Sequence, residues 1–183
     1  GAQVPRTMPP AYVAFQMEQA QSDRWFTPRY IERLNAAAAI FEYSPANIPF
    51  LGARGVDRAK IFHVPVWVSK QHLQAPSDGR IEADADFDVL FYGLPDGARR
   101  PQYLQALQER FRVKIIRDAF GADLYKDLKR AKVVVNIHYY EGAPLETTRL
   151  CECLTYGRLV ISERSKGDPE QSVFDPLVVF VDG

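Results

Sequence analysis

The chain has 183 residues, and its 23 basic and 23 acidic side chains cancel to a net charge of zero. Hydrophobic residues make up 46% and charged residues 25%, a globular composition that excludes a disordered or fibrous chain. The lack of a basic excess argues against a nucleic-acid partner, and no apolar run approaches the roughly 18 residues that span a bilayer, so no transmembrane segment is expected.

Residues 1–68 are predicted to form part of an α/β domain. A helix is expected at 28–38, because Thr27 can cap its N-terminus and Pro28 fits its first turn. A second short helix opens in the same way at Ser44-Pro45. Apolar runs of strand length occupy residues 11–15, 39–43 and 60–64.

The polar segment 69–86, which contains Pro76-Ser77-Asp78-Gly79, is predicted to be a linker. Beyond it, in 87–183, β-branched runs alternate with helical patterns, which indicates a doubly wound, Rossmann-like parallel sheet. Such sheets bind ligands beyond the carboxyl ends of their strands. The expected strands are 87–92, 113–117, 132–137, 158–162 and 177–181, and the expected helices are 101–111, 122–130 and 144–156.

The loop 138–144 leads from one expected strand into the helix 144–156. Gly142 allows close approach of a ligand to the backbone, and Pro144 suits the first helical turn. The free N–H groups and the positive end of the helix would then form a phosphate site. The alternative is an ordinary capped helix start.

Within that helix, Glu146, Arg149 and Glu152 repeat at a spacing of three residues and share one face. They could form an exposed ladder of ion pairs, which adds only a few tenths of a kcal/mol. Alternatively, Glu152 lies below the phosphate site and binds a ribose through its carboxylate.

A second loop, 93–100, follows the expected strand 87–92. Gly93 ends the strand, and Arg99 and Arg100 fall at a helix start, where cations oppose the helix dipole. That arrangement favours an anion docked between them, the alternative being that one of the two is a plain surface arginine.

The run Asp84-Ala85-Asp86-Phe87-Asp88 has the spacing of a metal-binding motif, but it precedes a strand and so lies at the wrong end of the sheet. No metal is therefore expected. Cys151 and Cys153 point in different directions on one helix, so they are predicted to be reduced residues of a cytoplasmic protein.

These patterns resemble a known family. The segment Asn136-Ile137-His138, followed by Arg149, Glu152 and Gly157 and then by Val160-Ile161-Ser162-Glu163, resembles the donor-binding half of GT-B glycosyltransferases. It is most similar to the family 1/4-like domains of the bacterial spore-protein-like branch. Residues 89–93 with Arg99-Arg100 also fit that domain, and residues 15–47 are similar to the end of the family's acceptor-side domain.

The resemblance implies a hexosyltransferase-like enzyme of polysaccharide biosynthesis. It would move a sugar from a nucleotide-diphosphate sugar to a hydroxyl of a glycan, lipid or protein acceptor, without a metal or cofactor. The helix start at 142–145 would hold the diphosphate and Glu152 the ribose. The donor-binding residues implied are Gly93, Arg99, Arg100, Gly142, Ala143, Leu145, Arg149 and Glu152.

The family's catalytic glutamate position falls here on Pro144, so Glu141 or His138 is expected to take its place. A full GT-B enzyme is about twice as long as this chain, which is therefore expected to be a fragment or a reduced module. The alternative function is a non-catalytic nucleotide- or glycan-binding module of the same fold. A receiver-like signalling domain with Asp118 as phosphoacceptor is a third possibility.

Overall fold

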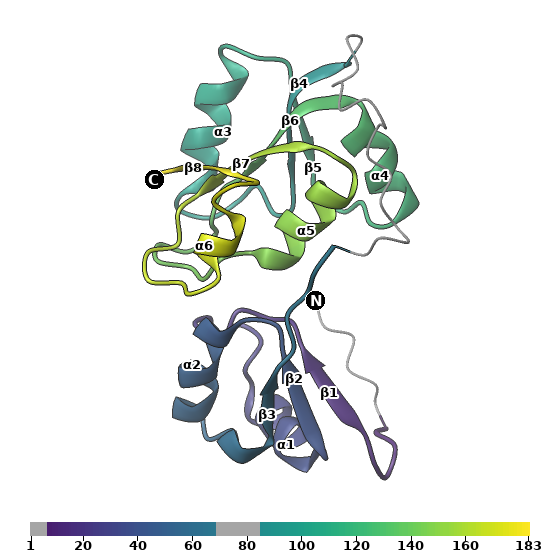
Figure 1. The fold of residues 1–183 in the computed structure, drawn as a ribbon, viewed down its shortest axis with the longest axis vertical. Helices are drawn as coiled ribbons and strands as arrows, with labels where there is room; N and C mark the ends of the chain where they lie inside the picture. Colours follow the sequence, from purple (N-terminus) through teal and green to yellow (C-terminus); the bar gives the residue numbers. More distant parts are fainter. Residues whose placement is uncertain (1–6, 69–84) are drawn as a thin grey trace. The chain divides into compact units, whose positions relative to one another are not determined.

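A computed structural model describes residues 7–68 and 85–183 (Figure 1). The chain divides into two compact units. The first holds the described residues up to Val66 together with Gly167–Glu170, and the second begins at Trp67 and holds the remainder. Apart from its last two residues, the predicted linker 69–86 lies outside the described residues.

The first unit contains a parallel sheet with the strand order β1-β2-β3. As predicted, Thr27 caps α1 by accepting a hydrogen bond from the Tyr30 amide, and Pro28 starts the helix. The elements are β1 (Val13–Gln16), α1 (Pro28–Ala36), β2 (Ala39–Glu42), η1 (Pro45–Asn47), α2 (Ile48–Ala53), η2 (Arg58–Lys60) and β3 (Ile61–His63).

The two faces of this sheet differ in exposure. Ile40 of β2 is fully buried in one core with Leu34 of α1 and Leu51 of α2. On the opposite face, Phe15, Phe41 and Phe62 stand in register across the strands and are 38–52% exposed. The alternation of the strands thus points one side chain into the core and the next out of it.

Polar residues align at the carboxyl ends of the same strands, where Gln16 pairs with Glu42 and Glu42 with His63. The fully buried Glu42 carboxylate accepts hydrogen bonds from the Gln16 side chain (3.1 Å), the Ser44 amide (3.0 Å) and the Asn47 side chain (2.9 Å). Burial raises the pKa of Glu42, although these donors act in the opposite direction. The network holds the loops after β1 and β2 together.

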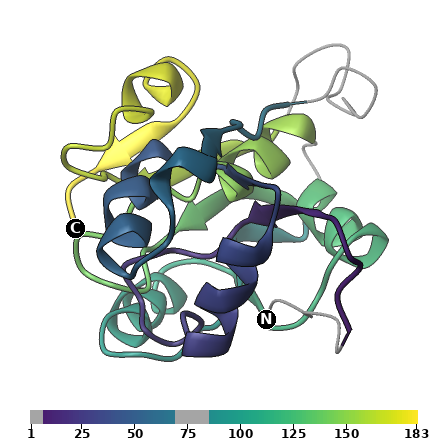
Figure 2. The same ribbon diagram turned by 90° about the horizontal axis from the view of Figure 1, so that it is seen from below.

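The second unit is a parallel five-stranded sheet with the order β5-β4-β6-β7-β8, which confirms the predicted doubly wound architecture. Helix α3 lies on one side of the sheet and α4 on the other (Figures 1 and 2). Its elements are β4 (Phe87–Tyr92), α3 (Arg100–Gln108), β5 (Val113–Ile116), α4 (Ala122–Lys129), β6 (Ala131–Asn136), α5 (Thr147–Thr155), β7 (Leu159–Glu163), α6 (Gln171–Phe174) and β8 (Val179–Val181).

Both faces of the second sheet are buried at its central strands β4 and β6. Val89 and Phe91 of β4 pack with Leu104 of α3. The intervening residues of the central strands, Leu90 and Val134, are fully buried on the other face. Burial on two sides explains why these strands read as continuous apolar runs rather than as alternating ones.

Two predicted helix boundaries are wrong by three residues. The helix expected at 101–111 ends at Gln108. The helix expected at 144–156 begins only at Thr147, and residues 143–146 are not helical. Pro144 therefore does not open the helix; Glu146 stands at its N-cap with φ −79° and ψ 61°. No helix among the described residues is long and apolar enough to cross a membrane.

The amino end of the second sheet carries ion pairs. Asp88 of β4 accepts hydrogen bonds from Arg112 (3.1 Å) and Lys132 (2.8 Å), and Asp86 pairs with Arg130. Asp84, the first residue of the aspartate run, lies outside the described residues. Among the described residues, no cluster of three or more His, Cys, Asp or Glu side chains could hold a metal ion.

The Asp88 cluster predicts a pH-dependent contribution to stability. Hydrogen bonds from Arg112 and then Lys132 hold the pKa of Asp88 well below its usual value. The contribution is therefore present above the unfolded pKa of about 3.9 and is lost as the pH falls further. We expect Asp88→Asn to lower the melting temperature at pH 7, and the deficit to shrink below about pH 4.

Thermal unfolding of the wild type and the variant across this pH range measures the effect. Asp123→Asn is the control, because the Asp123 side chain is 81% exposed. A deficit for Asp88→Asn that stays constant with pH would show that the ion pairs contribute little.

Candidate active site

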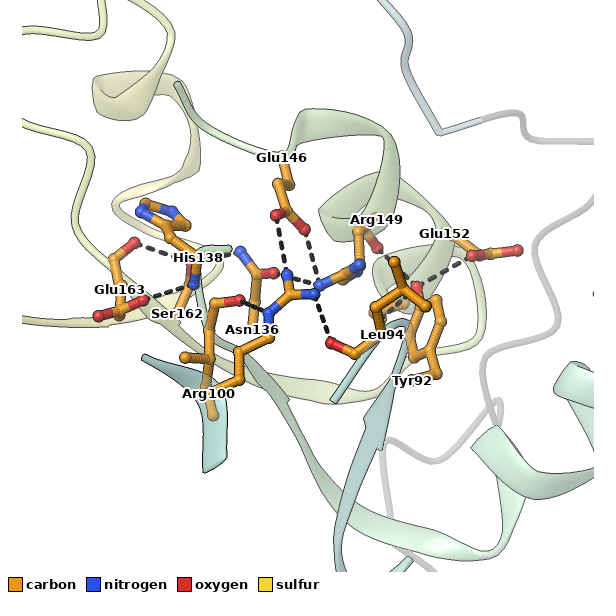
Figure 3. Close-up of polar contacts among 12 residues, drawn as sticks. Tyr92, Leu94, Arg100, Asn136, His138, Glu146, Arg149, Glu152, Ser162 and Glu163 are labelled. Carbon is orange, nitrogen blue, oxygen red and sulfur yellow. Dashed lines mark hydrogen bonds and ion pairs between the residues drawn. The ribbon is translucent and has the colours of Figure 1, made fainter. Parts of the chain in front are cut away.

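The strand order places a topological switch point between β4 and β6, since the chain leaves β4 toward β5 and returns to the other side of it. The loops that follow these two strands, 93–99 and 137–146, meet at their carboxyl ends. Figure 3 shows the polar side chains gathered there. This is the place where ligands bind in open parallel sheets.

Arg100 is the first residue of α3 and is only 3% exposed. Its guanidinium donates to the carbonyl oxygens of Ile137 (2.9 Å) and Leu94 (2.8 Å), so it ties the loop after β6 to the loop after β4. The rings of Phe91 and Tyr139 lie 5.2 and 5.1 Å from it. Burial lowers the pKa of Arg100 to about 10, which leaves the group charged at neutral pH.

Glu146 joins Arg100 to a second arginine of the same cluster. One carboxylate oxygen lies 3.4 Å from Arg100 Nη2, and the other lies 2.7 Å from Arg149 Nη1. Arg149 also donates to Asn136 Oδ1 at 2.7 Å, at the end of β6. The side chains of Glu146 and Arg149 are only 11% and 16% exposed, so the exposed ladder considered from the sequence does not form.

Gly93 brings the backbone directly against the two arginines. Its φ of +119° suits glycine alone, and a Cβ added there would lie 3.1 Å from Arg149 Nη2 and 3.9 Å from Arg100 Nη1. The strand end and both guanidinium groups therefore form one surface, on which a side chain at position 93 would intrude.

The first turn of α5 borders the same cluster. Thr147, its first residue, is 1% exposed, and its hydroxyl has no hydrogen-bond partner among the described residues. The amides of Thr147, Arg149 and Leu150 donate to the carbonyl oxygens of Leu145 and Glu146, so the hydroxyl and not these amides is the open donor of the turn. The positive end of a helix dipole thus faces the region beside the arginines.

Glu152 lies further along α5 and is half-buried. Its carboxylate accepts a hydrogen bond of 2.9 Å from the hydroxyl of Tyr92, the last residue of β4 (Figure 3). Five residues of helix separate Glu152 from Thr147, which corresponds to about 7.5 Å along the helix axis.

A second cluster is centred on Glu163 at the end of β7. Arg99 forms two hydrogen bonds with its carboxylate, at 2.6 and 3.1 Å, and the His138 amide donates to it as well. Burial would raise the pKa of Glu163, but the Arg99 guanidinium and the His138 amide hold it below its usual value. Arg99 is thus engaged with a carboxylate rather than standing free for an anion.

The two catalytic candidates lie in different environments. His138 is 3% exposed, and its Nε2 lies 3.3 Å from the Ser165 hydroxyl. Burial lowers the pKa of His138, so the ring is neutral at neutral pH. Glu141 lies in the exposed loop that follows. Their catalytic roles stay predictions.

The structure brings Gly93, Arg100, Arg149 and Glu152 into one cluster, and Arg99 with His138 into its neighbour. Of the predicted diphosphate loop, Gly142 is exposed while Ala143 and Leu145 are buried at 2% and 0%, and all three precede the helix start. Sequence reasoning missed the parts played by Tyr92, Asn136 and Glu163, and it considered Glu146 only as a member of an exposed helix face. Tyr92, Asn136 and Glu163 are present in the segments that carry the family resemblance, which was the available signal.

A cavity of about 460 Å³ adjoins these clusters, because Asn136, Ile137 and Glu163 form part of its lining. It is bordered by α3 residues such as Leu107 and by Phe111, Ile161 and Val181. The lining of this cavity is mostly apolar. An anion would therefore bind there less favourably than beside the arginines at the switch point.

No protein-family model and no curated protein sequence matches the chain. Solved structures do match its fold. HepE from Anabaena, solved in complex with UDP and glucose, aligns with a TM-score of 0.58 and 13% identity over 94% of this chain and 58% of its own. Sucrose-phosphate synthase from Thermosynechococcus elongatus aligns with a TM-score of 0.55 and 17% identity over 93% of this chain and 54% of its own.

These comparisons confirm the predicted fold, which is that of the GT-B glycosyltransferases, built from parallel α/β sheets. The chain spans little more than half the length of either neighbour. At such identities the likeness concerns the fold, and the chemistry has to be argued from the site.

The shared carboxylate makes a prediction about stability. We expect Glu146→Gln to lower the free energy of unfolding by about 3 kcal/mol, because it leaves two largely buried guanidinium groups without their common counter-charge. Urea unfolding measures the change. Glu141→Gln, in the exposed part of the same loop, is the control and should change stability by less than about 0.5 kcal/mol.

If Glu146→Gln were as stable as the wild type, the two arginines would be held by their other partners alone. The carboxylate would then have no structural role at the switch point.

Proposed function

We propose that the second unit binds a nucleotide-diphosphate sugar and that the protein transfers the sugar to an acceptor hydroxyl. The observation that carries the proposal is the arrangement at Gly93, where Arg100 and Arg149 share the single carboxylate of Glu146. The second acid of the cluster, Glu152, lies further along α5, so two guanidinium groups and one carboxylate meet beside Gly93 and concentrate positive charge at the ligand-binding edge of the sheet. A diphosphate is the anion that such a surface fits.

The first turn of α5 supports the same ligand. Thr147 supplies a buried hydroxyl without a partner among the described residues, and the positive end of the helix dipole favours negative charge. An anion that bound there would accept a hydrogen bond from this hydroxyl. The site therefore combines fixed backbone dipoles with the two arginines.

Glu152 supports the assignment of the sugar next to the phosphate. It lies about 7.5 Å along the helix from Thr147, which is the scale of one ribose between its 5′-phosphate and its two hydroxyls. A carboxylate can accept hydrogen bonds from both hydroxyls. We propose that Glu152 binds the ribose of the donor.

The chemistry follows from the charges. Cleavage of the glycosidic bond leaves negative charge on the departing diphosphate, which the arginines and the helix terminus stabilise. Because these groups supply the positive charge, we propose that transfer needs no metal. Glu141, exposed beside the site, is better placed than the enclosed His138 to contact the transferred sugar.

The structural neighbours support the ligand class. HepE was solved with UDP and glucose, which makes UDP the first nucleotide to test and a hexose the donor sugar that we propose. A non-catalytic nucleotide- or glycan-binding module is the second candidate, favoured by the burial of His138, one of the two catalytic candidates. Only the transferase would also bind a glycan, lipid or protein acceptor.

A thermal-shift screen with UDP, GDP, ADP and CMP, followed by hydrolysis assays with the matching sugar nucleotide, separates these candidates. Binding with hydrolysis supports the transferase, whereas binding alone supports the module. If no nucleotide binds and acetyl phosphate labels Asp118, the receiver-like alternative holds instead.

We expect one nucleoside diphosphate to raise the melting temperature by several degrees at a concentration of about 100 times its Kd, without added Mg²⁺. The reason is that the guanidinium groups and the positive end of the helix dipole already neutralise the phosphates. The control is the same titration in EDTA. Binding that disappears in EDTA would contradict the metal-independent site.

We expect Glu152→Gln to weaken nucleoside diphosphate binding by about tenfold to a hundredfold, because a hydrogen bond to a charged group is lost. Calorimetric titration with the ribo and 2′-deoxy forms measures it. Glu32→Gln, an exposed glutamate of α1, is the control. Equal binding of the two nucleotide forms by the wild type would show that Glu152 does not recognise a ribose.

A further inference from the structure

Tyr92 lies between the arginines and Glu152, and the proposed function assigns it no role. It is the last residue of β4 and is 9% exposed. One face of its ring packs against the Arg149 guanidinium, whose central carbon lies 5.0 Å from the ring centre. Its hydroxyl lies 2.9 Å from Glu152 Oε2.

The Glu152 carboxylate is the strongest acceptor for this hydroxyl. The two other candidates, the Arg149 carbonyl and the Cys153 sulfur, both lie at 3.5 Å. A hydrogen bond from a neutral donor to a carboxylate is shorter and stronger than one to a carbonyl or a thiol at that distance.

The phenol keeps its proton under all ordinary conditions. Burial raises the pKa of Tyr92 well above its usual value, and the negative charge of Glu152 adds to the effect. The hydroxyl is therefore a permanent donor to Glu152 Oε2.

This contact fixes the direction of a side chain that would otherwise rotate. A glutamate on a helix surface has several accessible rotamers, and ordering it on ligand binding costs free energy. Tyr92 holds one oxygen of Glu152 in place, which leaves the remaining lone pairs of the carboxylate in a fixed direction. Ordering before the ligand arrives strengthens binding.

We propose that Tyr92 is a positioning residue that orients the Glu152 carboxylate toward the two hydroxyls of the donor ribose, and that it thereby sets the preference for ribonucleotides over 2′-deoxyribonucleotides. The proposal rests on the proposed function, in which Glu152 binds the ribose. It adds that the discrimination depends on a strand residue that does not itself touch the sugar.

The test is Tyr92→Phe, which removes one oxygen atom and keeps the ring against Arg149. Calorimetric titrations with UDP and 2′-deoxy-UDP compare it with the wild type. We expect the variant to lose about tenfold in affinity for UDP and to bind 2′-deoxy-UDP nearly as the wild type does. A general structural defect would weaken both ligands equally.

Two controls isolate the hydroxyl's partner. Tyr12→Phe removes another part-buried tyrosine hydroxyl, which donates to the Arg33 carbonyl, and should leave both affinities unchanged. Cys153→Ala removes the sulfur acceptor and should keep the preference for UDP. In the Glu152→Gln background, Tyr92→Phe should have little further effect on UDP binding.

The outcomes distinguish this inference from the proposed function. If the wild type binds neither nucleotide, or binds both equally, the function proposed for Glu152 is wrong and the role of Tyr92 falls with it. If the wild type discriminates and Tyr92→Phe discriminates as well, only the positioning role is overturned. A Tyr92→Phe protein that fails to fold would also overturn it, because the hydroxyl would then serve the fold.

Discussion

The site depends on one carboxylate that two arginines share. Glu146 lies between Arg100 and Arg149, and these three side chains connect α3, β6 and α5 at the point where the sheet changes direction. A buried guanidinium without a counter-charge would be strongly destabilising, yet full neutralisation would leave nothing for a ligand. One carboxylate for two arginines meets both requirements, since it permits burial and retains positive charge.

The same geometry explains why the site extends along one side of α5. The N-terminus of α5 faces the arginines, and Glu152 follows about one and a half turns further along the helix. Tyr92 links these two regions, because its ring packs on Arg149 and its hydroxyl binds Glu152. The end of β4 thus supplies Gly93 for close approach and Tyr92 for orientation, in two successive residues.

The architecture could be predicted from the sequence, whereas the details of the site could be predicted only in part. Buried strands such as 87–92 and the capped start at Thr27-Pro28 are local patterns, and the structure contains both. The start of α5 was misplaced because Pro144 fits a helix locally, whereas the contact of Glu146 with Arg100 joins residues that are 46 positions apart and is a long-range effect. The burial of Arg100 could not be foreseen either, since one of its carbonyl partners, Ile137, lies 37 positions away in the sequence.

Gly93 has a consequence for how such a gene changes over time. Every single-base change of a glycine codon that replaces the residue adds a Cβ, and here that atom would lie 3.1 Å from the Arg149 guanidinium. No single-base change therefore gives a different residue that leaves this space empty. Among duplicated copies of the gene, a replaced Gly93 codon would therefore mark a copy in which the close approach of the backbone to Arg149 has been lost.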